Sequence, residues 1–137
     1  METSSSQLIV SVEYSSFSLI ETAYMSAAVH LSTTSSTKEL SIKHSSFKDL
    51  TAVFGSVTYC QACTVTLVNN THLRVIARYG GDYYMEDSLN DVVFDSQVSD
   101  TSYASKDGAS IYFYDYYPVP RTITINAATS TSSYFNL

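Results

Sequence analysis

The feature that most constrains this chain is a sequence repeat. The stretch SVEYSSFSLI at residues 11–20 is echoed by SIKHSSFKDL at residues 41–50. The same phase continues along the chain and defines five marker positions at intervals of 25 to 31 residues, which are Tyr14, His44, Asn69, Ser96 and Ala127. A repeat of this length predicts one supersecondary unit that stacks on copies of itself.

Each unit combines strand-like segments with corners. Apolar residues alternate with polar ones before each marker, which is typical of a strand. Eleven or twelve residues after a marker come Gly55, Gly80 and Gly108, three of the four glycines, where a tight corner requires positive φ. Period-two alternation argues against helical repeats, and propeller blades need about forty residues each. The pattern therefore predicts an all-β parallel solenoid with one coil per unit.

We expect a single domain over residues 1–137, with about five coils. The expected coils span roughly residues 7–37, 38–63, 64–88, 89–121 and 122–137. Like positions would stack about 4.8 Å apart in two inward-facing ladders. The first ladder would contain Val10, Leu40, Val65, Val92 and Ile123, and the second Val12, Ile42, Leu67, Phe94 and Ile125.

The strings LSIKHSSF and AVFGSVTY, followed by VTLVNNTH and ARYGGDYY, resemble the coils of right-handed parallel β-helix proteins. They are similar to the polymorphic outer membrane protein type, whose coils read roughly Asn-Ser-x-Phe and later Gly-Gly-Ala-Ile, and more loosely to pectate-lyase-like solenoids. Phe17 and Phe47 fill the phenylalanine position, and Gly80-Gly81 gives the double glycine. The resemblance covers about residues 7–130 and implies a right-handed parallel β-helix.

Two other folds fit parts of the pattern. About eight short strands could form an antiparallel β-sandwich. A capping box at Ser18–Glu21 with apolar residues at helical spacing, and a similar signal from Ser46 to Gly55, would instead give an α+β fold.

Charge is concentrated in the C-terminal part of the chain. Residues 1–81 contain five acids and five bases, whereas residues 82–137 contain eight acids and two bases and so carry the whole net charge of −6. Nucleic acid is therefore not an expected partner, because binding it needs a basic face. No run approaches the ~20 apolar residues of a membrane span, and residues 1–10 show no signal-peptide pattern.

The run DYYMEDSLNDVVFDSQVSD contains six acids and no base. The first interpretation is a solvated acidic face. Calcium is the alternative, because it takes carboxylate and amide oxygens, but Leu89 interrupts the EF-hand pattern. We expect no cofactor; the candidate calcium ligands are Asp87, Asn90, Asp91 and Asp95.

Cys60 and Cys63 form the motif YCQAC. Redox enzymes of the thioredoxin type place such a pair at a helix N-terminus, but here the strand-like TVTLV follows. A structural zinc site needs four ligands, and only three histidines could complete it. We expect a corner between coils in which the cysteines are either reduced or closing a small loop.

The stretch SIYFYDYYPVP predicts a tyrosine-rich outer face. Ile111 and Phe113 point to one side of the strand, and alternate tyrosines point to the other. Two further tyrosines lie at the equivalent place one coil earlier. Tyrosine offers rigid amphipathic contact area for sugars or proteins, and the candidate binding residues are Tyr83, Tyr84, Tyr112, Tyr114 and Tyr116.

The sequence lacks recognisable catalytic motifs. It has no Gly-x-Ser-x-Gly elbow, no phosphate-binding glycine loop and no string like the paired aspartate motifs of pectin-cleaving β-helix enzymes. We assign no catalytic residue and expect no enzyme.

Open solenoid ends expose strand edges. We therefore expect a structural or adhesive solenoid that self-associates end to end as a filament or surface-structure subunit, in an extracellular or cell-surface location. The alternatives are a glycan-binding module that uses the tyrosines, and a polysaccharide-acting enzyme that uses Asp87 or Asp91.

Overall fold

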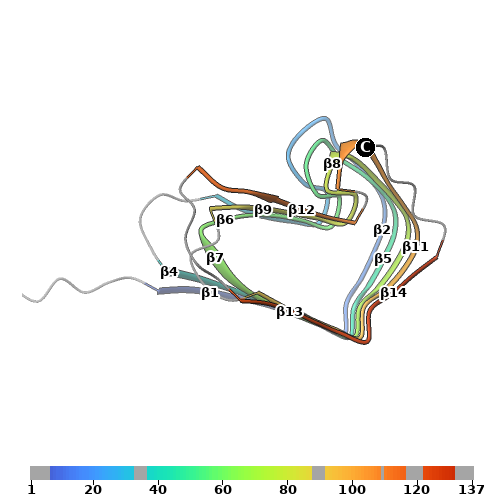
Figure 1. The fold of residues 1–137 in the computed structure, drawn as a ribbon. Coiled ribbons are helices and arrows are strands. Elements are labelled where there is room, and N and C mark those ends of the chain that lie inside the picture. The colour runs from blue at the N-terminus through green and yellow to red at the C-terminus, as the bar shows by residue number, and fades with distance from the viewer. Residues whose placement is uncertain (1–6, 33–36, 88–91, 109, 117–121, 132–137) are drawn as a thin grey trace, which may run out of the picture.

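The computed structural model is a three-sided parallel β-solenoid (Figure 1). It describes residues 7–32, 37–87, 92–108, 110–116 and 122–131. Within these ranges all the strand pairs are parallel and there is no α-helix. Successive strands enter sheets A, B and C in turn, so the antiparallel sandwich is wrong.

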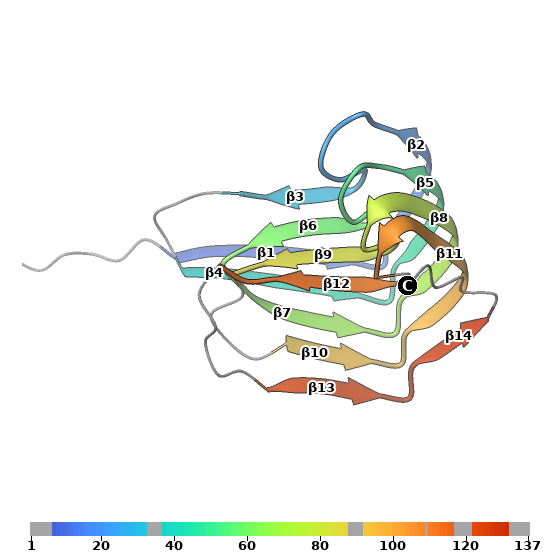
Figure 2. The same ribbon diagram turned by 45° about the horizontal axis from the view of Figure 1, so that its top comes forward.

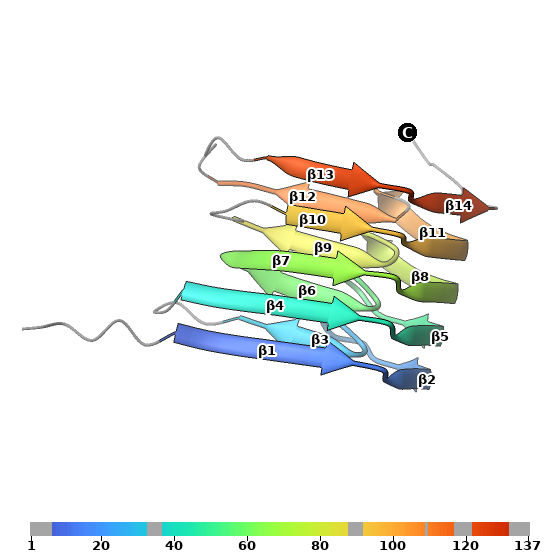
Figure 3. The same ribbon diagram turned by 90° about the horizontal axis from the view of Figure 1, so that it is seen from below.

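The three sheets run along the solenoid axis (Figures 2 and 3). Sheet A contains β1 (Gln7–Glu13), β4 (Thr37–Lys43), β7 (Cys63–Val68), β10 (Val92–Asp95) and β13 (Ile123–Asn126). Sheet B contains β2 (Ser16–Glu21), β5 (Ser46–Thr51), β8 (Thr71–Tyr79), β11 (Val98–Asp107) and β14 (Thr129–Thr131). Sheet C contains β3 (Val29–Leu31), β6 (Thr58–Gln61), β9 (Tyr83–Glu86) and β12 (Ile111–Tyr114).

The strand counts correct the expected number of coils. Sheets A and B contain five strands each, and sheet C contains four. Among the described residues, the last coil therefore contributes β13 and β14 but no strand of sheet C. The solenoid has about four complete turns rather than about five.

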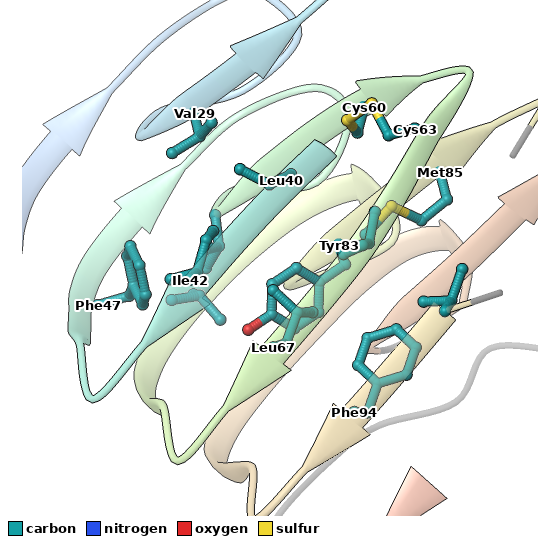
Figure 4. Close-up of a cluster of buried hydrophobic side chains, with 14 of the residues drawn as sticks. Val29, Leu40, Ile42, Phe47, Cys60, Cys63, Leu67, Tyr83, Met85 and Phe94 are labelled. Carbon is teal, nitrogen blue, oxygen red and sulfur yellow. A yellow bond between two sulfur atoms is a disulfide. The ribbon is translucent and has the colours of Figure 1, made fainter. Parts of the chain in front are cut away.

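Both predicted ladders of sheet A are confirmed. In the first ladder Val10 pairs with Leu40, Leu40 with Val65, Val65 with Val92, and Val92 with Ile123. The second ladder is paired in the same way from Val12 to Ile125. The middle members of the ladders are fully buried and form the core with side chains from sheets B and C (Figure 4).

The predicted corners also lie where the repeat placed them. The five markers all adopt a left-handed backbone, with φ between 48° and 52°. Gly55, Gly80 and Gly108 have positive φ as well, which confirms the predicted glycine corner. At Gly80 a Cβ would collide with the carbonyl oxygen of Tyr83, so no other residue fits without a backbone shift.

Sheet B contains a bend that the sequence did not predict. Four residues within its strands have φ between 51° and 59°, and they are absent from the pairing registers. The four strands that contain these residues, β2, β5, β8 and β11, curve in Figure 1. The bent positions are Leu19, Asp49, Arg74 and Thr101.

This bend explains why the helical alternative is wrong. The left-handed residue interrupts the alternation of the strand, so residues three apart both point inward. Phe47 and Leu50 are fully buried in β5 in this way, and Phe17 and Ile20 pack against the core from β2. The three-residue spacing of these apolar side chains, which is also typical of a helix, comes here from the bend in each strand.

Candidate functional site

The outer face of sheet C carries a ladder of aromatic rings. His30, Tyr59, Tyr84 and Tyr112 occupy one register column of β3, β6, β9 and β12. Neighbouring ring centroids lie 4.9, 5.4 and 5.2 Å apart, and the rings are stacked. The parallel coils therefore bring together aromatic residues that are about 25 to 30 positions apart in the chain.

The middle of this ladder is covered. Phe54, from the segment before β6, packs edge-on against Tyr84 at 4.9 Å and stacks on Tyr79 at 5.2 Å. Tyr59 and Tyr84 are buried, and burial raises the pKa of both phenols. The Tyr59 hydroxyl donates to Glu86 Oε2 at 2.5 Å. The central rings therefore form a small packed aromatic cluster on the outer face of sheet C, separate from the core inside the solenoid.

The expectation that Tyr83 shares this outer face is wrong. Successive residues of a strand point to opposite sides, so Tyr83 and Tyr84 cannot both face outward. Tyr83 pairs with Ile111 and points into the core (Figure 4). Of the five expected binding tyrosines, only Tyr114 and Tyr116 are well exposed, at 38% and 64%.

Tyr114 and Tyr116 form an exposed pair. Their ring centroids lie 5.0 Å apart at an interplanar angle of 82°. A hydrogen bond to Tyr116 is the main cause that raises the pKa of Tyr114. The backbone N–H of Tyr116 donates to Asp87 Oδ1 at 2.7 Å, which ties this pair to the end of β9.

Cys60 and Cys63 form a disulfide across the corner between β6 and β7. Both residues are fully buried, and Ala62 between them is left-handed with φ 55° (Figure 4). The pair therefore closes a small loop between strands, the second of the two states expected for it.

The acidic run does not assemble a metal site within the described residues. In those ranges no three His, Cys, Asp or Glu side chains are grouped so as to hold an ion. Asp87 accepts the bond from Tyr116, and Asp95 accepts one from the Ser96 hydroxyl at 3.0 Å. Asn90 and Asp91, the other two candidate calcium ligands, lie outside the described residues.

Both ends of the solenoid present unpaired strand edges within the described residues. β1 and β13 are the outer strands of sheet A, and β2 and β14 are the outer strands of sheet B. Ile123 and Ile125 continue the inward ladders but are 43% and 57% exposed. The positions that form the core elsewhere are thus open to solvent at the C-terminal end.

A buried polar cluster lies beneath this open end, and sequence reasoning missed it. A cavity of about 150 Å³ adjoins the cluster. The repeat aligns His72 with Phe47, so the register alone could have indicated that His72 points inward. The polar members are His72, Asp82, Tyr83, Gln97, Ser99, Ser102 and Ser110.

Comparison with protein-family models, with curated proteins and with solved structures finds no match for this chain. The resemblance to the polymorphic outer membrane protein type therefore rests on the sequence alone. In the described ranges, no helix is long and apolar enough to cross a membrane.

Proposed function

We propose that this protein is a non-enzymatic structural or adhesive β-solenoid that associates end to end with further copies, as a filament or surface-structure subunit. The observation that carries the proposal is the exposure of Ile123 and Ile125 on β13. One coil below, β10 buries the equivalent Val92 and Phe94 almost completely. An added coil would remove the two isoleucines from water in the same way.

A second copy offers strands that fit this edge. If its β1 paired with β13, both ladders would continue, with Val10 over Ile123 and Val12 over Ile125. β13 and β14 contain no charged residue and no proline, the features that normally protect an edge strand. Because the two ends of a solenoid differ, such a contact is head-to-tail and does not close. It therefore favours a filament.

The Cys60–Cys63 disulfide supports an oxidising location for this assembly. Disulfides persist in secreted and surface proteins and are rare in reducing compartments. An extracellular or cell-surface structure therefore remains the proposed setting.

The test compares Ile125→Lys with Thr66→Lys by sedimentation velocity across a concentration series. Thr66 faces outward from β7, in the register column of Thr124 but two coils away from the end. An inward-facing lysine blocks the pairing of edges. We expect I125K to weaken association at least about tenfold and T66K to match the wild type. Equal association of I125K and wild type would contradict the proposal.

A second candidate function is glycan binding by Tyr114 and Tyr116, an exposed pair at and just after the end of β12. Aromatic rings present flat apolar surfaces with a polar edge, which suits sugars. We expect Tyr116→Ala to abolish a signal on a glycan array and Tyr24→Ala, at a tyrosine that is still more exposed (80% against 64%), to keep it. An array on which the wild type binds nothing would remove this candidate.

A further inference from the structure

Asp82 places a carboxylate inside the solenoid. Asp82 lies at the corner before β9 and is 1% exposed. Hydroxyl groups surround it: Ser99 donates to Oδ2 at 2.9 Å, Ser102 donates to Oδ1 at 2.7 Å, and Ser110 donates to Oδ2. A buried carboxylate is costly unless a cation is also present.

His72 is the only basic side chain within 4.0 Å of this carboxylate in the described part of the chain. Its Nδ1 lies 3.8 Å from Asp82 Oδ2, which is too long for a hydrogen bond. Burial lowers the pKa of His72 more strongly than Asp82 raises it. The imidazole is therefore neutral at pH 7 and does not compensate the charge.

The hydrogen bonds around His72 determine which ring nitrogen carries the proton. Gln97 Nε2 donates to the Asp95 carbonyl at 2.7 Å, which turns Gln97 Oε1 toward Tyr83. The Tyr83 hydroxyl donates to that oxygen at 3.2 Å, so His72 Nε2, 2.6 Å away, must donate to Tyr83. Nδ1 is then an acceptor, and it is buried without a partner among the described residues.

Two acceptors thus face each other beside a cavity. His72 and Asp82 are both lining residues of the cavity of about 150 Å³, and His72 Nδ1 lies 3.8 Å from Asp82 Oδ2. The apolar part of the lining includes Phe94, Ile111 and Ile125. The exposed Ala128 and Thr129 lie at its rim, so the cavity is reachable from the C-terminal end.

The interior ladder explains why the cavity exists. Phe17, Phe47 and His72 form a column of stacked rings, with centroids 5.2 and 5.7 Å apart. The next position in the register is Ser99, whose side chain is too small to continue the column. A cavity of about 150 Å³ is large enough for a single six-membered ring.

We propose that this cavity binds a small organic cation, an ammonium group carried on a single ring. The ammonium donates to Asp82 Oδ2 and to His72 Nδ1, and the ring takes the place next to Ser99, against Phe94 and Ile111. The ligand supplies the positive charge and the donor that the described residues do not provide there. Charge-assisted hydrogen bonds in a buried site are among the stronger polar contacts.

The test is a calorimetric titration with benzylamine at pH 7, in protein dilute enough to be free of end-to-end association. Benzyl alcohol has the same shape without the charge, and benzoate reverses the charge. We expect benzylamine to bind at least about tenfold more tightly than benzyl alcohol and benzoate not to bind. Equal binding of benzylamine and benzyl alcohol, or no binding of benzylamine, would overturn the proposal.

Two variants locate the site. Asp82→Asn removes the charge at constant size and should reduce benzylamine affinity at least about tenfold, whereas Asp107→Asn at an exposed residue should leave it unchanged. Ala128→Phe should block the cavity from its rim without touching the polar cluster. If D82N does not fold, the wild-type comparison and A128F still decide the outcome. Unchanged binding in A128F would overturn the location.

Discussion

Single residues with left-handed backbones define the corners of this solenoid. Glycine is required at only some of them, because a side chain is tolerated wherever the backbone that follows the corner leaves room. Ala62 and Ala127 adopt φ of 55° and 48° with a Cβ in place, whereas a Cβ on Gly80 would strike the Tyr83 carbonyl. The geometry of the backbone that follows therefore decides which corners need glycine.

We expect Gly80→Ala to destabilise the fold by about 2 kcal/mol or more, through left-handed strain combined with the backbone collision. Ala62→Gly is the matched control, and we expect it to change stability little. Glycine relieves the left-handed strain at residue 62, but it also gives the unfolded chain more conformational freedom, and the two effects oppose each other. Urea denaturation of both variants measures the difference. A G80A variant as stable as the wild type would show that the corner can shift at little cost.

His72 makes stability depend on pH. Its folded pKa is lowered by burial, so the unfolded chain binds a proton more readily than the native protein does. The free energy of unfolding should therefore fall as pH decreases through about 6.5, the unfolded pKa. Chemical denaturation between pH 8 and pH 5 measures this slope.

His72→Gln should flatten the slope, because the variant has no proton to bind at this position. His30→Gln is the control. Burial of part of the ring also lowers the pKa of His30, but the residue as a whole is exposed. Its replacement should therefore change the pH slope of stability less than H72Q does. An identical slope in H72Q and the wild type would mean that His72 is not a neutral buried group.

At the scale of elements, sheet A was the part most readily predicted from the sequence. Its strands alternate strictly, so the apolar residues before each marker give the register directly. Sheet B was less predictable, because residues such as Leu19 and Arg74 give no sign of a left-handed bend. The bend changes which side chains point inward, and the same spacing is typical of a helix.

The candidate site was predicted only in part. Tyr114 and Tyr116 are exposed as expected, whereas Tyr83 is not, because a pair of neighbouring tyrosines must divide between the two faces of β9. The cluster around Asp82 gave no motif, since its members come from β8, β9, β11 and the corners before β9, β11 and β12. Only the stacked register brings them together.

The Cys60–Cys63 disulfide should contribute about 2 kcal/mol, because it closes a loop of only a few residues. We expect a reducing agent to lower the urea midpoint of the wild type by a corresponding amount. The double variant Cys60→Ala/Cys63→Ala should show no response to the reducing agent. A wild-type midpoint that is unchanged on full reduction would mean that packing alone maintains this corner.

For the whole molecule, the unequal strand counts matter most. Five strands in sheets A and B against four in sheet C leave the described C-terminal coil with two walls. The same incomplete coil exposes Ile125 and opens the cavity next to Asp82. End-to-end association and ligand binding are therefore separate consequences of one structural feature, and each can be tested without the other.

The most direct test of end-to-end association is negative-stain electron microscopy over a concentration series, with light scattering on the same samples. Five stacked strands span roughly 24 Å. We expect rods that lengthen with concentration, in steps close to that height, and a scattering mass that rises in parallel. Particles of one size and a monomeric mass at every concentration would contradict it.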